Sequence, residues 1–239
     1  MSSSGLQITP PTDLGVSQYA WSFEVVTTQK QHVPSAIVRD ANKALKGTKK
    51  VDLDGNASAE NPAVEPFVVE GADLIVESAS ELDAFNKIPL PKASTAKVTS
   101  NQKTKNQSLA SLTDGRIEDG FGPIFPNGIR NGAYKMDLGS SQSVTAISSW
   151  SFRKSKTRGK QKLVVYGSNA DSDPGWDLSK YSRLGTVDTS KSKGQFTAAS
   201  IRATGGKSLG KYRWIVWAVS PVSEAGGGEN TAFQELNVE

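Results

Sequence analysis

The loop at residues 114–120 carries the side chains best suited to binding a metal ion. It reads Asp-Gly-Arg-Ile-Glu-Asp-Gly, so Asp114, Glu118 and Asp119 supply carboxylates, and the glycines permit tight bends rich in backbone carbonyls. Calcium takes roughly six to eight hard oxygen ligands of these two kinds. The loop therefore predicts a calcium site, and the alternative is an ordinary Asp-Gly turn at the surface.

A second candidate is the basic run at residues 153–162, which places six Lys or Arg side chains in ten residues. Arginine offers a planar fork to carboxylate or sulfate, and lysine offers a point charge. The run predicts a site for an anionic polymer such as an acidic polysaccharide, anionic lipid or nucleic acid. Nucleic acid is disfavoured, because no recognised nucleic-acid fold or array of stacking aromatics accompanies the charges. The alternative is a solvated hairpin.

Aromatic residues in loops could stack on the apolar face of a sugar ring. Phe121 and Phe125 lie in the segment Phe-Gly-Pro-Ile-Phe, which we expect to be rigid and poorly buried. Trp176 is a third aromatic residue in a loop. The tryptophans within strands are expected in the core, namely Trp150, Trp214 and Trp217.

The composition excludes most nucleophilic catalysis. The chain has no cysteine and one histidine, His32, so it has no disulfide, no thiolate and no cysteine zinc site. A Ser-His-Asp triad would need His32, which we interpret as a surface residue. We expect a protein that is not an enzyme; the alternative is a carboxylate mechanism within residues 1–95.

Short strands at close spacing dominate the second half of the chain. Tyr134–Leu138 alternates, so Tyr134, Met136 and Leu138 should face a core. Residues 214–219 are apolar throughout, as expected of a central strand buried on both faces. Further strands are predicted at 144–150, 163–166, 196–201 and 233–238. This pattern predicts a mainly β protein with an antiparallel β-sandwich.

Residues 1–95 form an N-terminal region with a different pattern. A strand is predicted at 21–28, and two more within 66–79. A helix is predicted at 34–46, because Pro34 suits a first turn and Gly47 can end it. We therefore expect an N-terminal extension with one helix and a few strands at 1–95, of unknown role, followed by the sandwich at 96–239.

Six segments in order resemble the discoidin, or coagulation-factor type C, domain family. They are residues 111–115 (Ser-Leu-Thr-Asp-Gly), 134–139 (Tyr-Lys-Met-Asp-Leu-Gly), 144–150, 163–168 with the following Trp176, 211–215 (Lys-Tyr-Arg-Trp-Ile) and 233–238 (Phe-Gln-Glu-Leu-Asn-Val). The resemblance covers residues 96–239 and implies a galactose-binding-like jelly-roll β-sandwich. The turn at 169–175 is longer than in the family, and the absence of a disulfide is typical of microbial members.

The resemblance also implies a set of site residues. Asp114 and Glu235 would bind a structural calcium with loop carbonyls, tying the first and last strands together, and Glu118 is a further metal candidate. The basic run would lie on the binding face, and Trp176 would seal a hairpin. The candidate ligand-binding residues are Phe121, Phe125, Arg130, Arg153, Lys154 and Arg158.

The function implied by the resemblance is non-catalytic, lectin-like recognition of carbohydrate, in particular an acidic polysaccharide. A secreted, cell-surface or periplasmic location is expected, with a signal peptide that is not in this sequence. One alternative is adhesion to anionic lipid or matrix, for which Ile124 and Phe125 could supply apolar loop tips. Another is a structural assembly protein in which residues 1–95 act as a docking partner.

Overall fold

The computed structural model describes residues 65–153, 158–222 and 232–239, which lie within one unit, Ala59–Glu239. In these ranges no helix is long and apolar enough to span a membrane. The helices are short 3-10 turns: η1 (Leu82–Ala84), η2 (Leu109–Thr113) and η3 (Leu178–Lys180). The strands are β1 (Ala72–Ala79), β2 (Lys97–Ser100), β3 (Gly132–Val144), β4 (Ala146–Phe152), β5 (Lys162–Ser168), β6 (Ser182–Asp188), β7 (Phe196–Ala203), β8 (Gly210–Val219) and β9 (Phe233–Val238).

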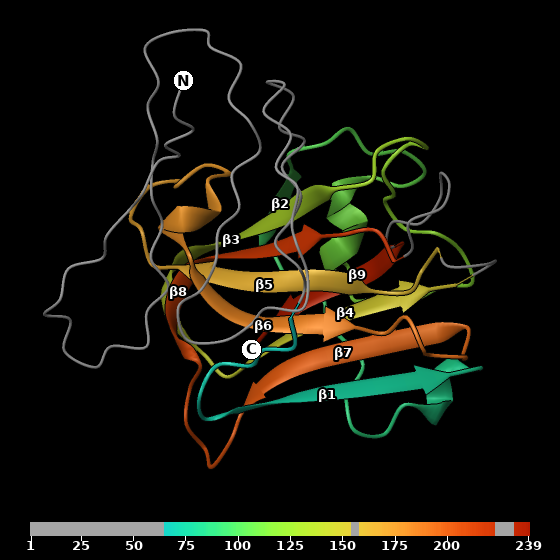
Figure 1. Cartoon of the computed structure of the whole chain (residues 1–239), viewed down its shortest axis with the longest axis horizontal. Helices are drawn as coiled ribbons and strands as arrows, with labels where there is room; N and C mark the ends of the chain where they lie inside the picture. The colour runs from blue at the N-terminus through green and yellow to red at the C-terminus, as the bar shows by residue number, and fades with distance from the viewer. Residues whose placement is uncertain (1–64, 154–157, 223–231) are drawn as a thin grey trace, which may run out of the picture. The chain divides into compact units, whose positions relative to one another are not determined.

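The strands form two antiparallel sheets (Figure 1). One has four strands in the order β1-β7-β4-β9, and the other has five in the order β2-β3-β8-β5-β6. The predicted antiparallel β-sandwich is confirmed. The helix predicted at 34–46 and the strand predicted at 21–28 lie outside the described residues.

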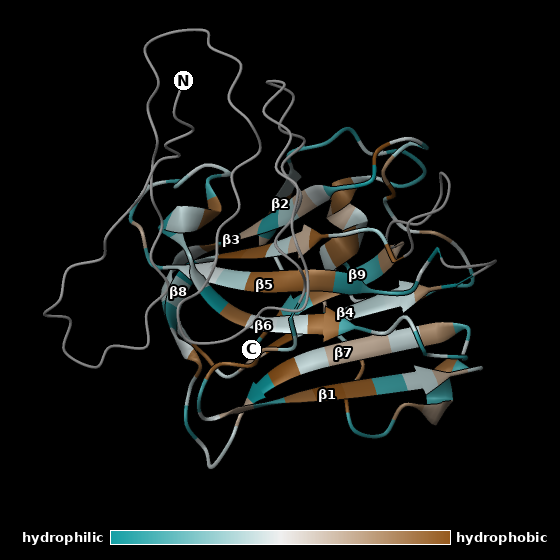
Figure 2. Ribbon diagram, in the orientation of Figure 1, coloured by the Kyte–Doolittle hydropathy of each residue, from teal (hydrophilic) through white to brown (hydrophobic). Residues whose placement is uncertain are grey.

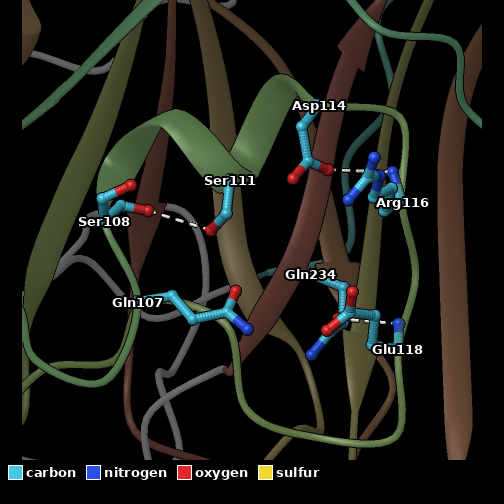
Figure 3. A pocket seen from close by; sticks show the side chains of 7 residues that line it. All are labelled: Gln107, Ser108, Ser111, Asp114, Arg116, Glu118 and Gln234. Atoms are coloured by element: carbon cyan, nitrogen blue, oxygen red, sulfur yellow. Dashed lines mark hydrogen bonds between the residues drawn. The ribbon is translucent and has the colours of Figure 1, made fainter.

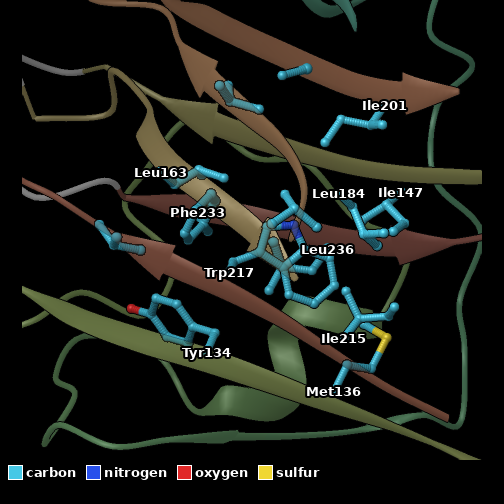
Figure 4. Packing of buried hydrophobic residues seen from close by; sticks show 14 of the residues in the cluster. Tyr134, Met136, Ile147, Leu163, Leu184, Ile201, Ile215, Trp217, Phe233 and Leu236 are labelled. Atoms are coloured by element: carbon cyan, nitrogen blue, oxygen red, sulfur yellow. The ribbon is translucent and has the colours of Figure 1, made fainter. Parts of the chain in front are cut away.

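The main core lies between the sheets (Figure 4). Tyr134 and Met136 of β3 are buried there as their alternation predicted, and Leu138 packs against the same core although it is half-buried. Figure 2 shows apolar stretches in strands of both sheets. The fully buried large side chains include Trp217, Leu163, Ile147, Phe233 and Leu236.

Strand β8 is buried on both faces, as its continuous apolar sequence predicted. Ile215 and Trp217 belong to the core between the sheets, whereas Trp214 and Val216 belong to a second cluster with Tyr166. Since successive side chains of a strand point to opposite faces, this second cluster lies on the outer face of the five-stranded sheet. The turn after β5 fixes the indole of Trp214 in this cluster, because its Nε1 donates a hydrogen bond to the carbonyl of Ala170 (2.9 Å).

The sandwich begins earlier in the chain than the sequence indicated. β1 pairs with β7 along its whole length, from Ala72 opposite Ala203 to Ala79 opposite Phe196. Just before β1, the N–H of Val69 donates to the carbonyl of Leu184 in β6 (2.9 Å). The expected boundary at residue 96 is therefore corrected: residues 67–79 are part of the sandwich. The alternating pattern of β1 alone could not show which sheet it joins.

Candidate functional site

The loop between β2 and β3 is closed at its base by backbone pairing. Lys105 and Ile124 exchange hydrogen bonds, with the Lys105 N–H donating over 2.9 Å and the Ile124 N–H over 3.1 Å. Asn106 has φ of 82° and donates its side-chain amide to the carbonyls of Gly122 (3.2 Å) and Phe121. Asparagine is among the few non-glycine residues that tolerate this left-handed backbone. The loop is thereby held in one shape around the candidate metal-binding residues.

Glu235 of β9 is brought to the metal-candidate loop. Its side chain is 0% exposed, and Oε1 accepts a hydrogen bond from the N–H of Gly115 (3.1 Å). Among the described residues the other oxygen, Oε2, is buried without a partner. A buried carboxylate oxygen without a hydrogen bond is costly and calls for a proton, water or cation. The pair Asp114 and Glu235 expected from the resemblance is close enough in space for their charges to interact.

The electrostatics of this pair oppose two bare carboxylates. Burial raises the pKa of the Glu235 carboxyl to about 8, the Gly115 N–H works against this rise, and the charge of Asp114 adds to it. Both the burial cost and the repulsion would fall if a cation stood between the carboxylates. Within the described residues, no three Asp, Glu, His or Cys side chains cluster as a metal site, so backbone carbonyls would have to complete the shell.

Glu118 does not join the other two carboxylates. Its side chain is exposed, and its N–H donates to Oε1 of Gln234 (3.1 Å). Figure 3 shows Glu118 beside Gln234, away from Asp114. The structure thus groups two of the three candidate metal ligands and separates the third.

A small polar pocket of about 240 Å³ adjoins this site (Figure 3). Within it, Asp114 Oδ1 accepts from the N–H of Arg116 (2.9 Å), and the Ser111 hydroxyl donates to the carbonyl of Ser108 (2.9 Å). The lining combines amide, hydroxyl, carboxylate and guanidinium groups, so it presents donors and acceptors side by side. It consists of Gln107, Ser108, Ser111, Asp114, Arg116, Glu118 and Gln234. Most of these residues were missed from the sequence, because isolated polar residues in a loop resemble ordinary surface.

The aromatic candidates are placed differently from expectation. Phe125 is 0% exposed and stacks on Tyr134, with ring centroids 5.0 Å apart and planes at 9°. It fits because Gly132 leaves room: a Cβ there would lie 2.6 Å from the Phe125 ring. Phe125 is therefore a core residue and not a plate for a sugar. Phe121 is half-buried and meets Phe152 edge-on, with centroids 6.2 Å apart.

Trp176 is more exposed than a sealing residue would be. Its side chain is 36% exposed, although its ring lies over the Nζ of Lys135 at 4.3 Å. Lys135 itself is buried and bonds to Asp173 and to the carbonyl of Gly175 (3.2 Å). One face of the indole is thus fixed by a cation–π contact with the sheet below it.

The arginines of the basic run hold loops together. Arg158 is 8% exposed; its Nη2 donates to Oδ1 of Asn127 (3.0 Å), and its guanidinium lies 5.7 Å from the Phe121 ring centroid. Arg153 is half-buried and donates from Nε to the carbonyl of Gly194 (3.2 Å) and from Nη2 to that of Lys193. Both guanidinium groups thus bond to the protein itself, although Arg153 and Arg158 were expected to offer them to a ligand. Arg130 is exposed, and Lys154 lies outside the described residues.

No family model and no curated protein matches the sequence. Solved structures with a similar fold do exist. The fold is similar to chitosan-binding module 1 of a chitosanase/glucanase from Paenibacillus sp. IK-5 (15% identity, 62% of this chain and 96% of that one, TM-score 0.44). It is similar to a fucolectin from Morone saxatilis, striped bass, serum (13% identity, 60% of this chain and 46% of that one, TM-score 0.45). A third similar structure is the family 32 CBM of C. perfringens NanJ in complex with galactose (14% identity, 60% of this chain and 92% of that one, TM-score 0.39). At these low identities and TM-scores, the similarity carries no argument about function.

Proposed function

We propose that this protein is a non-catalytic carbohydrate-binding module whose sandwich is stabilised by calcium. The observation that carries the proposal is the polar pocket beside the buried carboxyl of Glu235. Sugar hydroxyls both donate and accept hydrogen bonds, and the pocket offers both kinds of partner within one small volume.

The calcium site would be built from Asp114, Glu235 and carbonyls of the loop at 114–120. These residues fit the ion, because Oε2 of Glu235 is buried without a partner in the described structure and Asp114 is its charged neighbour. Calcium would supply charge compensation and a link between the loop and β9. Asp114 would position the loop, and Glu235 would anchor it to the last strand. The role is structural.

An acidic polysaccharide is the narrower form of this proposal. With the guanidinium groups of Arg153 and Arg158 engaged, the exposed positive side chains that could meet such a ligand include Lys191 and Lys193. Exposed pairs of this kind contribute about 0–1 kcal/mol each and weaken with salt. An extracellular, cell-surface or periplasmic location stays a prediction.

A glycan array tests the proposal. The protein should bind neutral or acidic glycans in calcium, and Arg116→Ala combined with Gln107→Ala should weaken that binding without lowering the melting temperature. Lys180→Ala, an exposed change in η3, is the matched control and should bind as the parent does. Absence of binding to every glycan, with binding to anionic vesicles instead, would overturn the carbohydrate assignment in favour of lipid adhesion.

A further inference from the structure

A second cavity opens on the side of the sandwich, between the edge strands β2 and β9. Its volume is about 410 Å³, and it shares no lining residue with the first pocket. We propose that this side cleft is a second ligand site and that it takes a neutral saccharide ring. Its lining is Ser94, Thr95, Ala96, Lys97, Met136, Asp137, Leu138, Gly139, Gln142, Leu236, Asn237 and Val238. The volume falls within the roughly 300–1,000 Å³ of small-molecule sites.

The cleft exists because the two sheets part at this edge. The pairing of β2 with β3 stops at Lys97 opposite Asp137. The pairing of β3 with β8 is interrupted between Asp137 and Gln142, where Gly139 has φ of 82°. η2 packs against both β2 and β9, and so closes another part of the same side. The opening is thus fixed by the backbone rather than by one movable side chain.

The floor of the cleft is apolar and continuous with the core. Met136 and Leu236 are fully buried members of the core between the sheets, and Leu138 and Val238 pack against that core. Met136 and Leu236 lie beneath the floor, and its accessible apolar surface is that of the half-buried Leu138 and Val238, which can receive the C–H face of a sugar ring. Because these side chains belong to a packed core, the floor is rigid.

The walls offer hydrogen-bonding groups that the described structure leaves unused. No hydrogen bond in the described residues engages the side-chain amide of Asn237 or Gln142, and both residues contribute to the lining of the cleft. A primary amide donates through nitrogen and accepts through oxygen. Two lining residues with such side chains could meet a ring whose hydroxyls also do both.

The backbone of β9 adds further groups. The N–H of Glu239 donates to the carbonyl of Ala146 (2.9 Å), and the N–H of Ala146 donates back (3.3 Å). These two residues form a hydrogen-bonded pair, and such pairs alternate along an antiparallel ladder. Val238 and Leu236 therefore turn their N–H and carbonyl groups away from β4, toward the open edge.

The lining carries one acidic and one basic side chain, Asp137 and Lys97, so it is not dominated by charge of either sign. Asp137 accepts from Arg213 Nε (2.9 Å), from Arg213 Nη2 (3.2 Å) and from the N–H of Gly139 (2.9 Å). Lys97 stands directly opposite Asp137 on the neighbouring strand. An extended peptide fits less well, because β9 contributes to the cleft only from Leu236 to Val238, fewer than the roughly five residues of a typical strand.

This inference goes beyond the proposed function, since the side cleft does not depend on the first pocket or on calcium. Its consequence is bivalency: a module with two sugar sites would hold a polysaccharide more tightly than either site alone.

The test uses NMR of the isotope-labelled full-length protein, titrated separately with glucose, galactose and N-acetylglucosamine. At least one sugar should shift the side-chain amide signals of Asn237 and Gln142 together with the backbone amides of Leu236 and Val238. The double variant Asn237→Ala, Gln142→Ala should remove the shifts at Leu236 and Val238 and keep the parent's melting temperature. The amide signals of Gln107 and Gln234 report the first pocket in the same spectra, and their response should not change in the variant.

Three results would overturn the proposal. One is that none of the three sugars moves Asn237 or Gln142. Shifts confined to Gln107 and Gln234 would support the first pocket and refute the second. A short extended peptide that moves the signals of Leu236 and Val238, when the sugars do not, would make the cleft a strand-addition site.

Discussion

Gly115 donates its backbone N–H to Oε1 of Glu235 over 3.1 Å, joining two residues 120 positions apart in the chain. The contact requires glycine: φ at Gly115 is 77°, and a Cβ there would lie 2.5 Å from the backbone nitrogen of Ala93. Three segments, those of Ala93, Gly115 and Glu235, therefore meet at one point. A cation bound there would stabilise all three together.

Calcium should raise the melting temperature of the parent protein, and chelator should reverse the rise. A ligand that binds only the folded state stabilises it by about 2.7 kcal/mol at a hundredfold excess over its dissociation constant. For a protein of this size that is a rise on the order of 5–10 °C. Asp114→Ala and Glu235→Gln should each remove the gain, as measured by thermal unfolding with calcium and with chelator.

The matched control for this prediction is Glu118→Gln, because Glu118 lies apart from the other two carboxylates. This variant should keep the rise in melting temperature that calcium produces in the parent. Equal melting temperatures of the parent in calcium and in chelator would refute the metal site and leave the sugar pocket to be tested on its own.

Gly115→Ala should destabilise the protein more than a change at another left-handed glycine. Gly128 has φ of 91° but nothing within 4 Å of an added Cβ, so Gly128→Ala measures the backbone strain alone. That strain costs about 1 kcal/mol. Gly115→Ala adds a clash with backbone, which cannot move aside as a side chain can. Urea unfolding should show the larger loss at Gly115; equal losses would mean that the loop relaxes around the added methyl group.

The strands whose buried faces follow from the local pattern of apolar residues were predictable from the sequence. The alternation of Tyr134 and Met136 placed both side chains in the core, and the apolar run from Trp214 to Val219 marked a strand covered on both faces. The proximity of Asp114 and Glu235 came from resemblance, because no local rule relates residues so far apart. The structure brings them close, and whether they bind calcium stays a prediction.

The misplaced residues share a physical reason, which is that their environment is made by distant segments. Phe125 is buried because Gly132 and Tyr134 leave a slot for its ring, and no property of its own segment indicates that slot. Arg158 is buried because Asn127 and Phe121 receive its guanidinium. The side cleft was likewise invisible, because it depends on where two sheets part.

The ion pair between Asp137 and Arg213 should make the folded protein less stable as the pH falls into the acidic range. Hydrogen bonds from the Arg213 side chain hold the pKa of Asp137 below its ordinary value of 3.8; burial opposes this, and the Gly139 N–H adds to it. Because the pKa is lowered in the folded state, the stabilisation is present above pH 3.8 and is lost as the pH falls through the folded-state value. Both side chains are 26% exposed, so the contribution is about 1 kcal/mol or less.

Thermal unfolding of Asp137→Asn should show a smaller loss of melting temperature than the parent between neutral pH and pH 3. Asp83→Asn, an exposed change in η1, is the control and should follow the parent curve. Parallel curves for Asp137→Asn and the parent would mean that the ion pair contributes nothing measurable.

Arg158→Ala should lower stability rather than remove a ligand contact. The change deletes a largely buried guanidinium, its hydrogen bond to Asn127 and its contact with the Phe121 ring. Leaving buried polar partners unsatisfied costs about 1–3 kcal/mol. Each kcal/mol corresponds to roughly 2–4 °C of melting temperature at this size. Lys191→Ala, an exposed charge from the same end of the sandwich, should leave the melting temperature unchanged.

Heparin binding separates the structural role of Arg158 from a direct role in binding an acidic polysaccharide. If the guanidinium clamps the loop, Arg158→Lys should also lose stability, since lysine keeps the charge but not the planar fork. Heparin retention of both Arg158 variants, measured well below their melting temperatures, should then fall no more than that of Lys191→Ala. An unchanged melting temperature with a large, salt-dependent loss of heparin binding would instead make Arg158 a ligand-binding residue, as its place in the basic run first indicated.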